Sequence, residues 1–286
     1  MSVTHFSSFL KIQDGIMLDR ESYLQRVGYA GNAVSGLVDL AALVQAHQMS
    51  VPWENLAVFL DEPQALSIDV LFERIVAQRR GGTCWELNFL FAALLDELGF
   101  QASFLCAQSW DPRNSDWTPP FDHMVLSISI SGHDYLVDVG LGKALLPPLP
   151  LHRECAVSEG CRMRIEGRWR IIDQMHPRTT EWKVAYRFEL TAFSPDDFVP
   201  QYRLRHTTSG SHFTDNWFVA MAGRSGVSRL IDTYLVDAGR ASGAEKLTPA
   251  NLHDRLSRVF GLDLKGRVPR LSEGVRAAWS AVDGGL

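Results

Sequence analysis

Hydrophobic residues recur with helical spacing in three segments of the first hundred residues, 35–49, 68–78 and 84–99. The apolar face consists of Leu37, Leu40, Val44 and His47 in the first segment, with Ser35 as its N-cap, and of Leu71, Ile75 and Val76 in the second. The third segment carries a wider apolar face, and Gly99 follows it as a stop signal. We therefore expect helices in all three segments.

From about residue 101 the hydrophobic positions alternate with polar ones, which is the period of a β-strand. The alternation is clearest in four segments that end in Gly, Asp or Pro turns: 123–131, 133–141, 161–173 and 182–193. The prolines within 146–151 predict a rigid extended loop that interrupts the pattern. The sequence thus predicts a meander of antiparallel strands that continues to about residue 205.

The rest of the chain mixes the two periods. Residues 212–223 and 228–239 resemble the two strands of a hairpin, whereas 248–264 and 272–286 resemble helices. No internal repeat or low-complexity linker divides the sequence. A chain of 286 residues is long for one domain and short for two, so we expect one compact body with subdomains.

Composition and charge narrow the functional classes. Hydrophobic residues make up 46% of the chain and charged residues 21%, which is ordinary for a globular protein in water. The net charge is −5 and no basic block is long enough to follow phosphates, so we expect no nucleic-acid partner. The first residues lack a signal-peptide pattern, and every long apolar stretch is interrupted. We expect a cytoplasmic monomer or homodimer that does not bind a membrane.

The four cysteines differ in their surroundings. In a reducing compartment they are not expected to form structural disulfides. His152, Cys155 and Cys161 are near one another in sequence but lack a CxxC pair and a fourth ligand, so we expect no metal site there. Cys106 lies in a strand-like apolar run, where it is most simply a small buried side chain. The remaining one, Cys84, has a more unusual setting.

Cys84 follows two glycines and stands in the first turn of the predicted helix at 84–99. Unpaired backbone N–H groups and the positive end of the helix dipole favour a thiolate at such a place. Gly81 and Gly82 allow a sharp turn and leave room beside the sulfur for a substrate carbonyl. A buried cysteine that only packs is the commoner case, so the loop alone leaves both interpretations open.

A thiolate nucleophile needs a base, and usually a third group that orients the base. His123 begins a predicted strand 123 − 84 = 39 residues after the cysteine, and Asp138 ends the next strand 15 positions later. Their midpoint falls in the predicted turn at Ser131, so the two side chains come nearly opposite each other in a hairpin. A surface histidine and a turn-capping aspartate are each common alone, but together with the cysteine loop they indicate a triad.

Several short motifs occur along the chain in a fixed order. Arg-Gly-Gly-X-Cys-aromatic-Glu-X-Asn is matched at 80–88, His-Met-X-Leu at 123–126, and Val-Asp-Val-Gly-Phe-Gly at 137–142 with leucine in place of phenylalanine. Upstream, 23–29 matches Tyr-Leu-X-Arg-Ile-Gly-Tyr, and 51–56 matches Ile-Pro-Phe-Glu-Asn-Leu with tryptophan as the aromatic residue. From about residue 20 to 150 the chain therefore resembles the arylamine N-acetyltransferases.

This resemblance implies an α+β fold in three parts. Residues 1–100 would form a helical bundle with the nucleophile loop, 101–205 an antiparallel β-barrel that carries the histidine and the aspartate, and 206–286 an α/β lid. A papain-like triad of Cys84, His123 and Asp138 would lie between the first two parts. Arg80 and Glu54 both belong to matched motifs, and we expect them to form a buried structural ion pair.

The resemblance also implies a reaction. An acetyl or short acyl group would pass from an acyl-CoA thioester to an arylamine or hydrazine, through an acyl-cysteine intermediate in a ping-pong scheme. Acyl-CoA would be a cosubstrate, and no permanently bound cofactor or metal is expected. Trp53, Leu141 and Gly142 would contact the acceptor, and Tyr202 and His206 would contact the acyl-CoA.

The chain departs from the family pattern in the predicted lid. A stretch associated with acyl-CoA has Tyr202 in place of an asparagine and His206 in place of a serine, and it adds Arg203 and Arg205. The change is either neutral drift in a lid strand or the mark of a different donor, such as a bulkier thioester or a carrier protein. The arginines could meet a phosphate, although alternating arginines are more often a solvated strand face.

Other functions remain compatible with the same triad. One is an amide synthase of a natural-product pathway that uses a carrier-bound or larger acyl donor. Another is a cysteine hydrolase or a transglutaminase-like enzyme. A catalytically silent scaffold is disfavoured, because such a protein has no chemical reason to keep all three residue types at workable spacing.

Overall fold

The computed structural model describes residues 18–31, 36–62, 65–157, 160–176, 179–240, 243–273 and residue 275. Ser35 and nearly all of the helix expected at 272–286 lie outside these residues. Within them, no helix combines the length and the apolar character needed to cross a membrane.

Three segments of the N-terminal bundle are helical as periodicity predicts, and the structure adds the helices α1 (Arg20–Val27) and α3 (Leu56–Phe59), which periodicity did not predict. The three predicted segments contain α2 (Leu37–Ser50), α4 (Ile68–Leu71) with the π-helical segment η1 (Phe72–Ala77), and α5 (Cys84–Glu97). Gly36 occupies the N-cap position of α2. The helix expected at 68–78 is confirmed, but it widens into π-helical turns from Phe72 onward.

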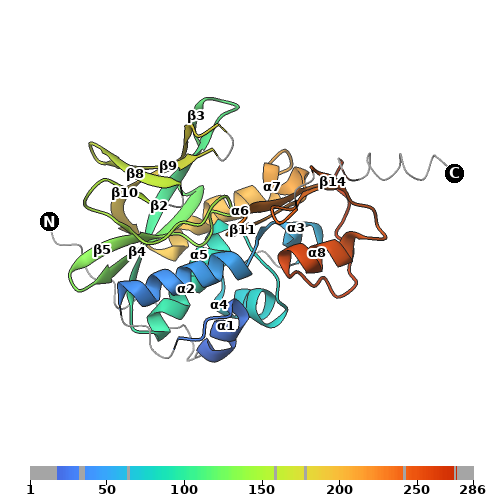
Figure 1. Cartoon of the computed structure of the whole chain (residues 1–286), viewed down its shortest axis with the longest axis horizontal. Helices are drawn as coiled ribbons and strands as arrows, with labels where there is room; N and C mark the ends of the chain where they lie inside the picture. The colour runs from blue at the N-terminus through green and yellow to red at the C-terminus, as the bar shows by residue number, and fades with distance from the viewer. Residues whose placement is uncertain are drawn as a thin grey trace.

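Antiparallel strands form a nearly closed barrel beside the bundle (Figure 1). Their order is β6-β5-β4-β2-β10-β9-β8-β7, with β3 attached to β2. The strands are β2 (Gln101–Asp111), β3 (Asp116–Trp117), β4 (His123–Ile130), β5 (His133–Val137), β6 (Leu149–Pro150), β7 (Cys155–Val157), β8 (Cys161–Glu166), β9 (Trp169–Met175) and β10 (Trp182–Phe193).

The β4–β5 hairpin turns where its sequence predicts. Leu126 pairs with Val137 and Ile130 with His133, so the strands reverse through Ser131 and Gly132. These two turn residues have φ of 51° and 78°, which is the left-handed pair that a two-residue hairpin turn requires. This register brings His123 and Asp138 to the same end of the hairpin.

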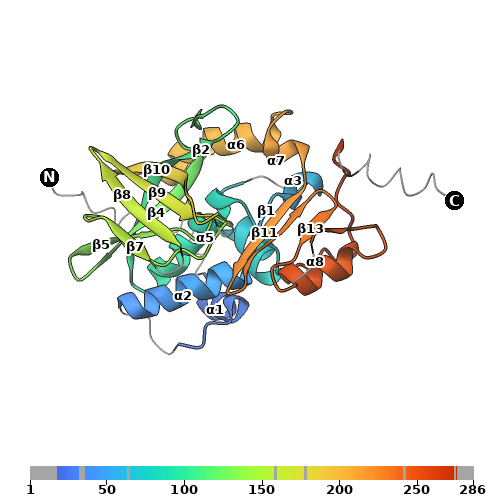
Figure 2. The same ribbon diagram turned by 45° about the horizontal axis from the view of Figure 1, so that its top comes forward.

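The chain after the barrel forms helices and a second antiparallel sheet, shown in Figure 2. The helices are η2 (Pro195–Phe198), α6 (Val199–Thr207), α7 (His212–Asp215) and α8 (Leu252–Phe260). The sheet has the order β1-β11-β12-β13-β14, from β1 (Trp53–Glu54), β11 (Phe218–Gly223), β12 (Gly226–Ile231), β13 (Tyr234–Val236) and β14 (Glu245–Lys246). We call it the C-terminal sheet.

Three expectations from periodicity need correction. The strand expected at 212–223 begins with the helix α7, and the strand expected at 228–239 is divided between β12 and β13. The barrel strands end at Phe193, and the segment expected to continue as strand to about residue 205 is the helix α6. Alternating arginines in this segment therefore do not form a strand face. The proline-rich segment 146–151 also contains a short strand, β6, which pairs with β5.

The helix α5 is the centre of the molecule. Every residue from Cys84 to Leu95 is buried, because the helix packs against α1 and α4 on the bundle side and against β2 and β4 of the barrel. A helix that is buried all round needs no polar face. The bundle and the barrel consequently share one hydrophobic core, which includes Leu90, Phe91 and Leu126.

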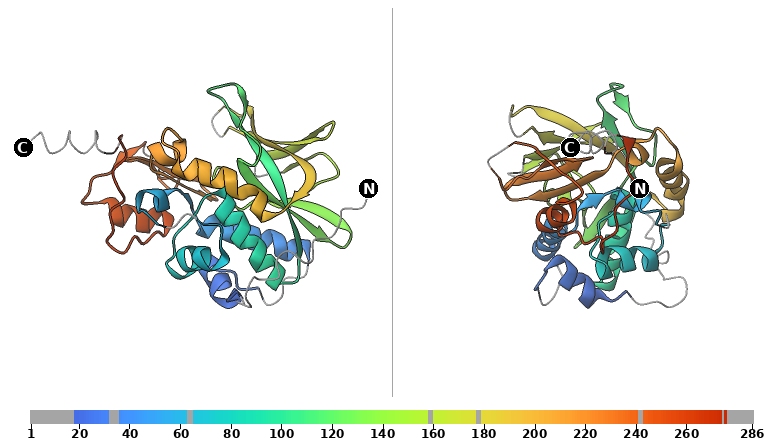
Figure 3. Two further views of the ribbon diagram at one scale, coloured as in Figure 1. Left: turned by 180° about the vertical axis from the view of Figure 1, so that it is seen from behind. Right: turned by 90° about the vertical axis from the view of Figure 1, so that its right-hand side faces the viewer.

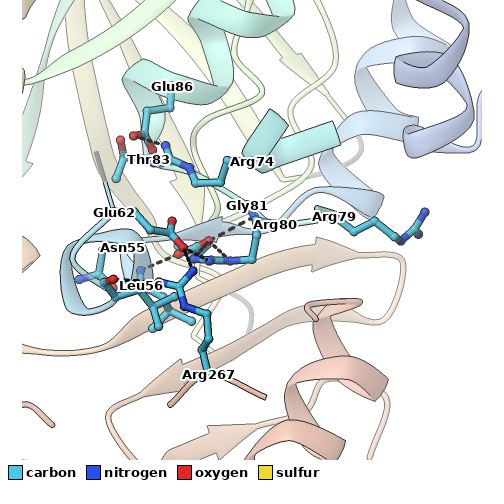
Figure 4. A network of polar contacts seen from close by, with 12 residues as sticks. Asn55, Leu56, Glu62, Arg74, Arg79, Arg80, Gly81, Thr83, Glu86 and Arg267 are labelled. Atoms are coloured by element: carbon cyan, nitrogen blue, oxygen red, sulfur yellow. Dashed lines mark hydrogen bonds and ion pairs between the residues drawn. The ribbon is translucent and has the colours of Figure 1, made fainter. Parts of the chain in front are cut away.

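A buried ion pair fixes the loop before α5, as the sequence motifs predicted (Figure 4). Arg80 donates to Glu54 Oε1 through Nε at 3.1 Å and through Nη2 at 2.7 Å. The backbone N–H of Leu56 also donates to this carboxylate. Arg80 Nη1 continues the network to Glu62, which Arg267 reaches from the C-terminal part of the chain. The loop is thereby tied to β1 and to the C-terminal part.

Replacing Arg80 with alanine should lower the free energy of unfolding by roughly 3–5 kcal/mol, because the change leaves the Glu54 carboxylate buried without its countercharge. Chemical denaturation measures this change. Arg267→Ala is the matched control, since this arginine contacts the same network but its side chain is 47% exposed. The control should cost less than about 1 kcal/mol. Equal unfolding midpoints for Arg80→Ala and the parent would refute the structural role.

Candidate active site

Cys84 is the first residue of α5, and close backbone packing fixes the loop in front of it. A Cβ on Gly81 would lie 2.1 Å from the Pro52 carbonyl oxygen, so only glycine fits there. The Gly82 carbonyl accepts the Glu54 N–H at 3.0 Å, which joins the loop to β1. Gly81 is thus required by the close approach of the β1 segment, whereas a Cβ on Gly82 would meet the Glu86 side chain at 2.9 Å.

The start of α5 is capped by its own third residue. The Glu86 carboxylate accepts the N–H of Thr83 at 2.8 Å, and on its other side it forms an ion pair with Arg74. This pairing keeps the pKa of Glu86 below its ordinary value although burial acts in the opposite direction. A charged capping residue fixes the first turn of the helix, and with it the position of the cysteine.

The structure brings together the three residues that the sequence proposed as a triad. His123 Nε2 lies 2.8 Å from Asp138 Oδ2, and the Cys84 thiol is close enough to the same ring for each group to shift the pKa of the other. Because Nε2 faces the carboxylate, Nδ1 is the nitrogen left for the sulfur. The three groups thus form a chain from thiol to imidazole to carboxylate, and all three side chains are buried.

Asp138 has no exposed surface, and its second oxygen is fully occupied. Oδ1 accepts the Asn88 amide at 2.9 Å and the Gly140 N–H at 2.8 Å. Asn88 Oδ1 also accepts the Val139 N–H at 3.0 Å, so one side chain fixes both the carboxylate and its loop. Gln48 of α2 donates to the Asp138 carbonyl at 2.9 Å. Side chains of the bundle therefore fix the Asp138 carboxylate, which in turn orients the His123 ring.

Burial and charge act against each other in this triad. Burial favours the neutral form of His123, but Asp138 and Cys84 outweigh it and raise its pKa to about 10. Burial also opposes ionisation of Asp138, yet His123, Asn88 and Gly140 hold its pKa below the ordinary value. Burial raises the pKa of the Cys84 thiol, and His123 opposes that increase. The pKa of Cys84 remains above its ordinary value, so a thiolate there depends on a charged His123 ring.

Cys84 opens into a cavity of about 400 Å³ between the barrel and the C-terminal sheet. Trp53 and Leu141 line it, as do Phe213 and Phe218, whose rings lie 5.7 Å and 5.2 Å from the Trp53 ring. Gly142 lies behind this wall, with φ of 64°, and a Cβ there would come within 2.7 Å of Trp53. The cavity thus presents aromatic surface next to the thiol.

Tyr202 and His206 do not line this cavity; the structure places both in the core beneath α5. Tyr202 Oη donates to Glu86 Oε1 at 2.8 Å, and the His206 ring lies 5.5 Å from the Trp85 ring. A cofactor cannot touch side chains in this position unless α6 moves. Their placement therefore differs from the expected contact with acyl-CoA, and their structural role is to dock α6.

Cys106, Cys155 and Cys161 lie apart from the cavity and form no disulfide. Cys161 is buried in the barrel, and Cys106 accepts the Phe121 N–H at 3.0 Å. His152 lies against Asp134 at 3.2 Å. Among the described residues, no three histidine, cysteine or acidic side chains converge as metal ligands would.

The comparisons with known proteins agree with this geometry. A family profile described as N-acetyltransferase matches residues 36–268. The chain belongs to the arylamine N-acetyltransferase family. An arylamine N-acetyltransferase of Mycolicibacterium smegmatis is 32% identical over 260 residues, which is 86% of this chain and 93% of that protein.

Two further relatives are informative about the family. The structure of Mycobacterium marinum arylamine N-acetyltransferase in complex with CoA is 27% identical and superposes with a TM-score of 0.77, covering 88% of this chain and 96% of that chain. Proansamycin X synthase of Amycolatopsis mediterranei is 32% identical over 183 residues, which is 60% of this chain and 68% of that protein. The α+β fold expected from the motifs is confirmed by the solved relatives.

The structure adds site residues to which the sequence analysis gave no role. The spacing of Asn88 is a usable signal, because it stands four positions after Cys84 and so shares its helix face. Gln48 gives no such signal, since its partner Asp138 is 90 residues away. Phe213 and Phe218 are ordinary apolar positions in the sequence, and only the fold brings them to the cavity of this arylamine N-acetyltransferase family member.

Iodoacetamide should modify Cys84 before the other cysteines near neutral pH. Exposure alone predicts the opposite order, because Cys84 is 4% exposed whereas Cys106 and Cys155 are only half-buried. His123→Ala should slow the modification by roughly tenfold or more, since the imidazolium that stabilises the thiolate is lost. Peptide mapping over time measures both rates. Modification of Cys84 no faster than that of Cys106 would argue against a nucleophile.

Stability should fall as pH rises above the ordinary histidine range. The pKa of His123 is 6.5 in an unperturbed chain and about 10 in the folded protein, so between these values its folded ring holds a proton that the unfolded ring lacks. The test uses the Cys84→Ala background, because a Cys84 thiolate would give up one proton as the ring gains one and leave the total unchanged. The free energy of unfolding should then decrease by at most about 1.4 kcal/mol per pH unit. Denaturation at about pH 7 and about pH 9 measures the slope, which His123→Gln should flatten. An identical slope in both proteins would contradict a protonated His123.

Proposed function

We propose that this protein transfers an acetyl or short acyl group from an acyl-CoA thioester to an arylamine or hydrazine in the cytoplasm. The observation that carries the proposal is the arrangement of the Cys84 thiol beside the His123 ring, which is hydrogen-bonded to Asp138, next to the aromatic wall of the cavity. Family membership supports acyl transfer as the reaction class. The acyl group is held on Cys84 between two half-reactions.

The first half-reaction loads the cysteine. The Cys84 thiolate attacks the thioester carbonyl, a carbon–sulfur bond to Cys84 forms, and the bond to the CoA sulfur breaks. His123, protonated because its pKa is about 10, gives its proton to the departing thiolate. A thioester suits this step because one thiolate replaces another of similar leaving ability.

The second half-reaction releases the product. The amine attacks the acyl-cysteine carbonyl, and His123, now neutral, accepts the proton that the amine loses. The bond to the Cys84 sulfur breaks, which restores the thiolate beside the imidazolium. Throughout the cycle Asp138 fixes the orientation of the ring and stabilises its charged form.

The walls of the cavity favour a flat acceptor. Trp53, Phe213 and Phe218 present three rings near the thiol, and Leu141 adds an aliphatic side chain to the same lining. Aromatic walls hold a planar ring by stacking and by burial of its surface. A small aromatic amine fits both the chemistry of the surface and a volume of about 400 Å³.

CoA as the carrier of the acyl group is supported by a relative. The solved Mycobacterium marinum enzyme is described as a complex with CoA, and it covers 88% of this chain. The fold that receives CoA in that protein is thus present here. We therefore regard acyl-CoA as a cosubstrate that binds and leaves in each cycle.

A second candidate is an amide synthase that uses a larger or carrier-bound donor. The relative named proansamycin X synthase is as similar in sequence, at 32% identity, as the Mycolicibacterium smegmatis enzyme, although over fewer residues. Relatives at this level of identity therefore include a protein named as a synthase as well as one named as an arylamine N-acetyltransferase. The two candidates differ in the donor and not in the triad.

Mixing the protein with acetyl-CoA and no acceptor should release a burst of free thiol, one equivalent per Cys84, because acylation precedes acceptor binding. A thiol-reactive dye, applied after removal of protein, measures the burst. Cys84→Ala should give no burst while keeping the parental unfolding midpoint. Acylation by a carrier-bound or simple aryl ester donor, without a burst from acetyl-, propionyl- or malonyl-CoA, would favour the amide synthase instead.

A further inference from the structure

The helix α6 lies across the two elements that carry the nucleophile and the base. Figure 3 shows it beside α5, between the barrel and the C-terminal sheet. Tyr202 binds Glu86 in the first turn of α5. One turn further along, Arg205 Nε donates to Asp122 Oδ1 at 2.5 Å, directly before β4 and His123. The helix thus contacts the first turn of α5, which carries Cys84, and the residue directly before His123.

Asp122 contacts both α6 and Cys84. Its side chain is 5% exposed, and Gln201 of α6 donates to the same Oδ1 at 3.1 Å. Its backbone carbonyl oxygen lies 3.9 Å from the Cys84 sulfur. A buried carboxylate without a countercharge is costly, and next to a thiolate it also repels. Arg205 supplies the countercharge.

We propose that Arg205 is a positioning residue for the reacting pair: through Asp122 it holds the peptide before His123 against the Cys84 sulfur and neutralises the carboxylate beside it. The proposal rests on the proposed function only in that Cys84 is the reacting group. It also gives a reason for the departure from the family pattern in this segment. Tyr202 and His206 dock α6 on α5, and Arg205 extends the same docking to the base.

The charge on Cys84 depends on groups from every element around it. They are His123 and Asp122 at the start of β4, Asp138 and Lys143 in the loop after β5, Arg205 on α6 and Glu86 on α5. Burial has the largest effect on the pKa of the thiol and raises it, His123 lowers it, and Asp122 raises it again. Glu86 is already paired with Arg74. Loss of Arg205 therefore leaves the repulsion from Asp122 without compensation.

The rate of Cys84 alkylation by iodoacetamide as a function of pH tests this role without any acyl donor. Arg205→Gln should move the midpoint of the profile upward by on the order of one pH unit, which is a roughly tenfold slower reaction at neutral pH. Asp122→Asn should move the midpoint in the opposite direction, because it removes the carboxylate and keeps the arginine. The double variant should fall between the two single variants.

Arg203→Gln is the matched control, because this arginine stands two positions away on the same helix and is exposed. It should keep the parental midpoint. Arg205→Lys retains the positive charge and should return the midpoint close to the parental value. If Arg205→Gln does not fold, Asp122→Asn still decides the question, since a merely structural arginine predicts the parental midpoint for it.

A parental midpoint in Arg205→Gln and Asp122→Asn, with only the unfolding temperature lowered, would overturn the proposal. This result is distinct from failure of the proposed function, which would appear as an absent thiol burst with a normal alkylation profile. A shifted profile together with no burst from any short acyl-CoA would keep Arg205 as the positioning residue and change only the donor.

Discussion

Asp138 has no exposed surface, yet partners from the bundle and the barrel keep its carboxylate ionised. A buried charge persists only when its oxygens are hydrogen-bonded and a countercharge is near. Asn88 and Gly140 saturate one oxygen, and His123 takes the other. The two parts of the molecule cannot separate without exposing or stranding this charge. The hydrogen bonds that satisfy this buried carboxylate therefore join the bundle to the barrel and also fix the position of the His123 ring.

Buried ion pairs recur around α5 for a related reason. Arg80 with Glu54 fixes the loop before the helix, Arg74 with Glu86 fixes its first turn, and Arg205 with Asp122 fixes the start of β4. The first two pairs lie within the bundle, whereas Arg205 and Asp122 are 83 positions apart in the sequence. Removing one member is costly because the other stays buried. Such pairs hold the cysteine and the histidine in register while the cavity beside them stays open.

The local features of the site could be predicted from the sequence. Apolar periodicity located α5, so Cys84 could be assigned to its first turn, and a two-residue turn at Ser131 placed His123 near Asp138. Contacts between distant segments could not be predicted this way. The segment that forms α6 alternates arginines as a strand would, and its helical form is decided by packing of Tyr202 and His206 under α5. The contact of Gln48 with the Asp138 loop has no local signature either.

The central claim is that the buried carboxylate holds His123 in its charged form beside Cys84. Nitrogen NMR of the His123 ring as a function of pH tests this claim most directly, because the two protonation states give different shifts for both ring nitrogens. We predict an imidazolium throughout the neutral range, with loss of its proton only as the pH approaches about 10. Titration of the ring near its ordinary value of 6.5 would contradict the account.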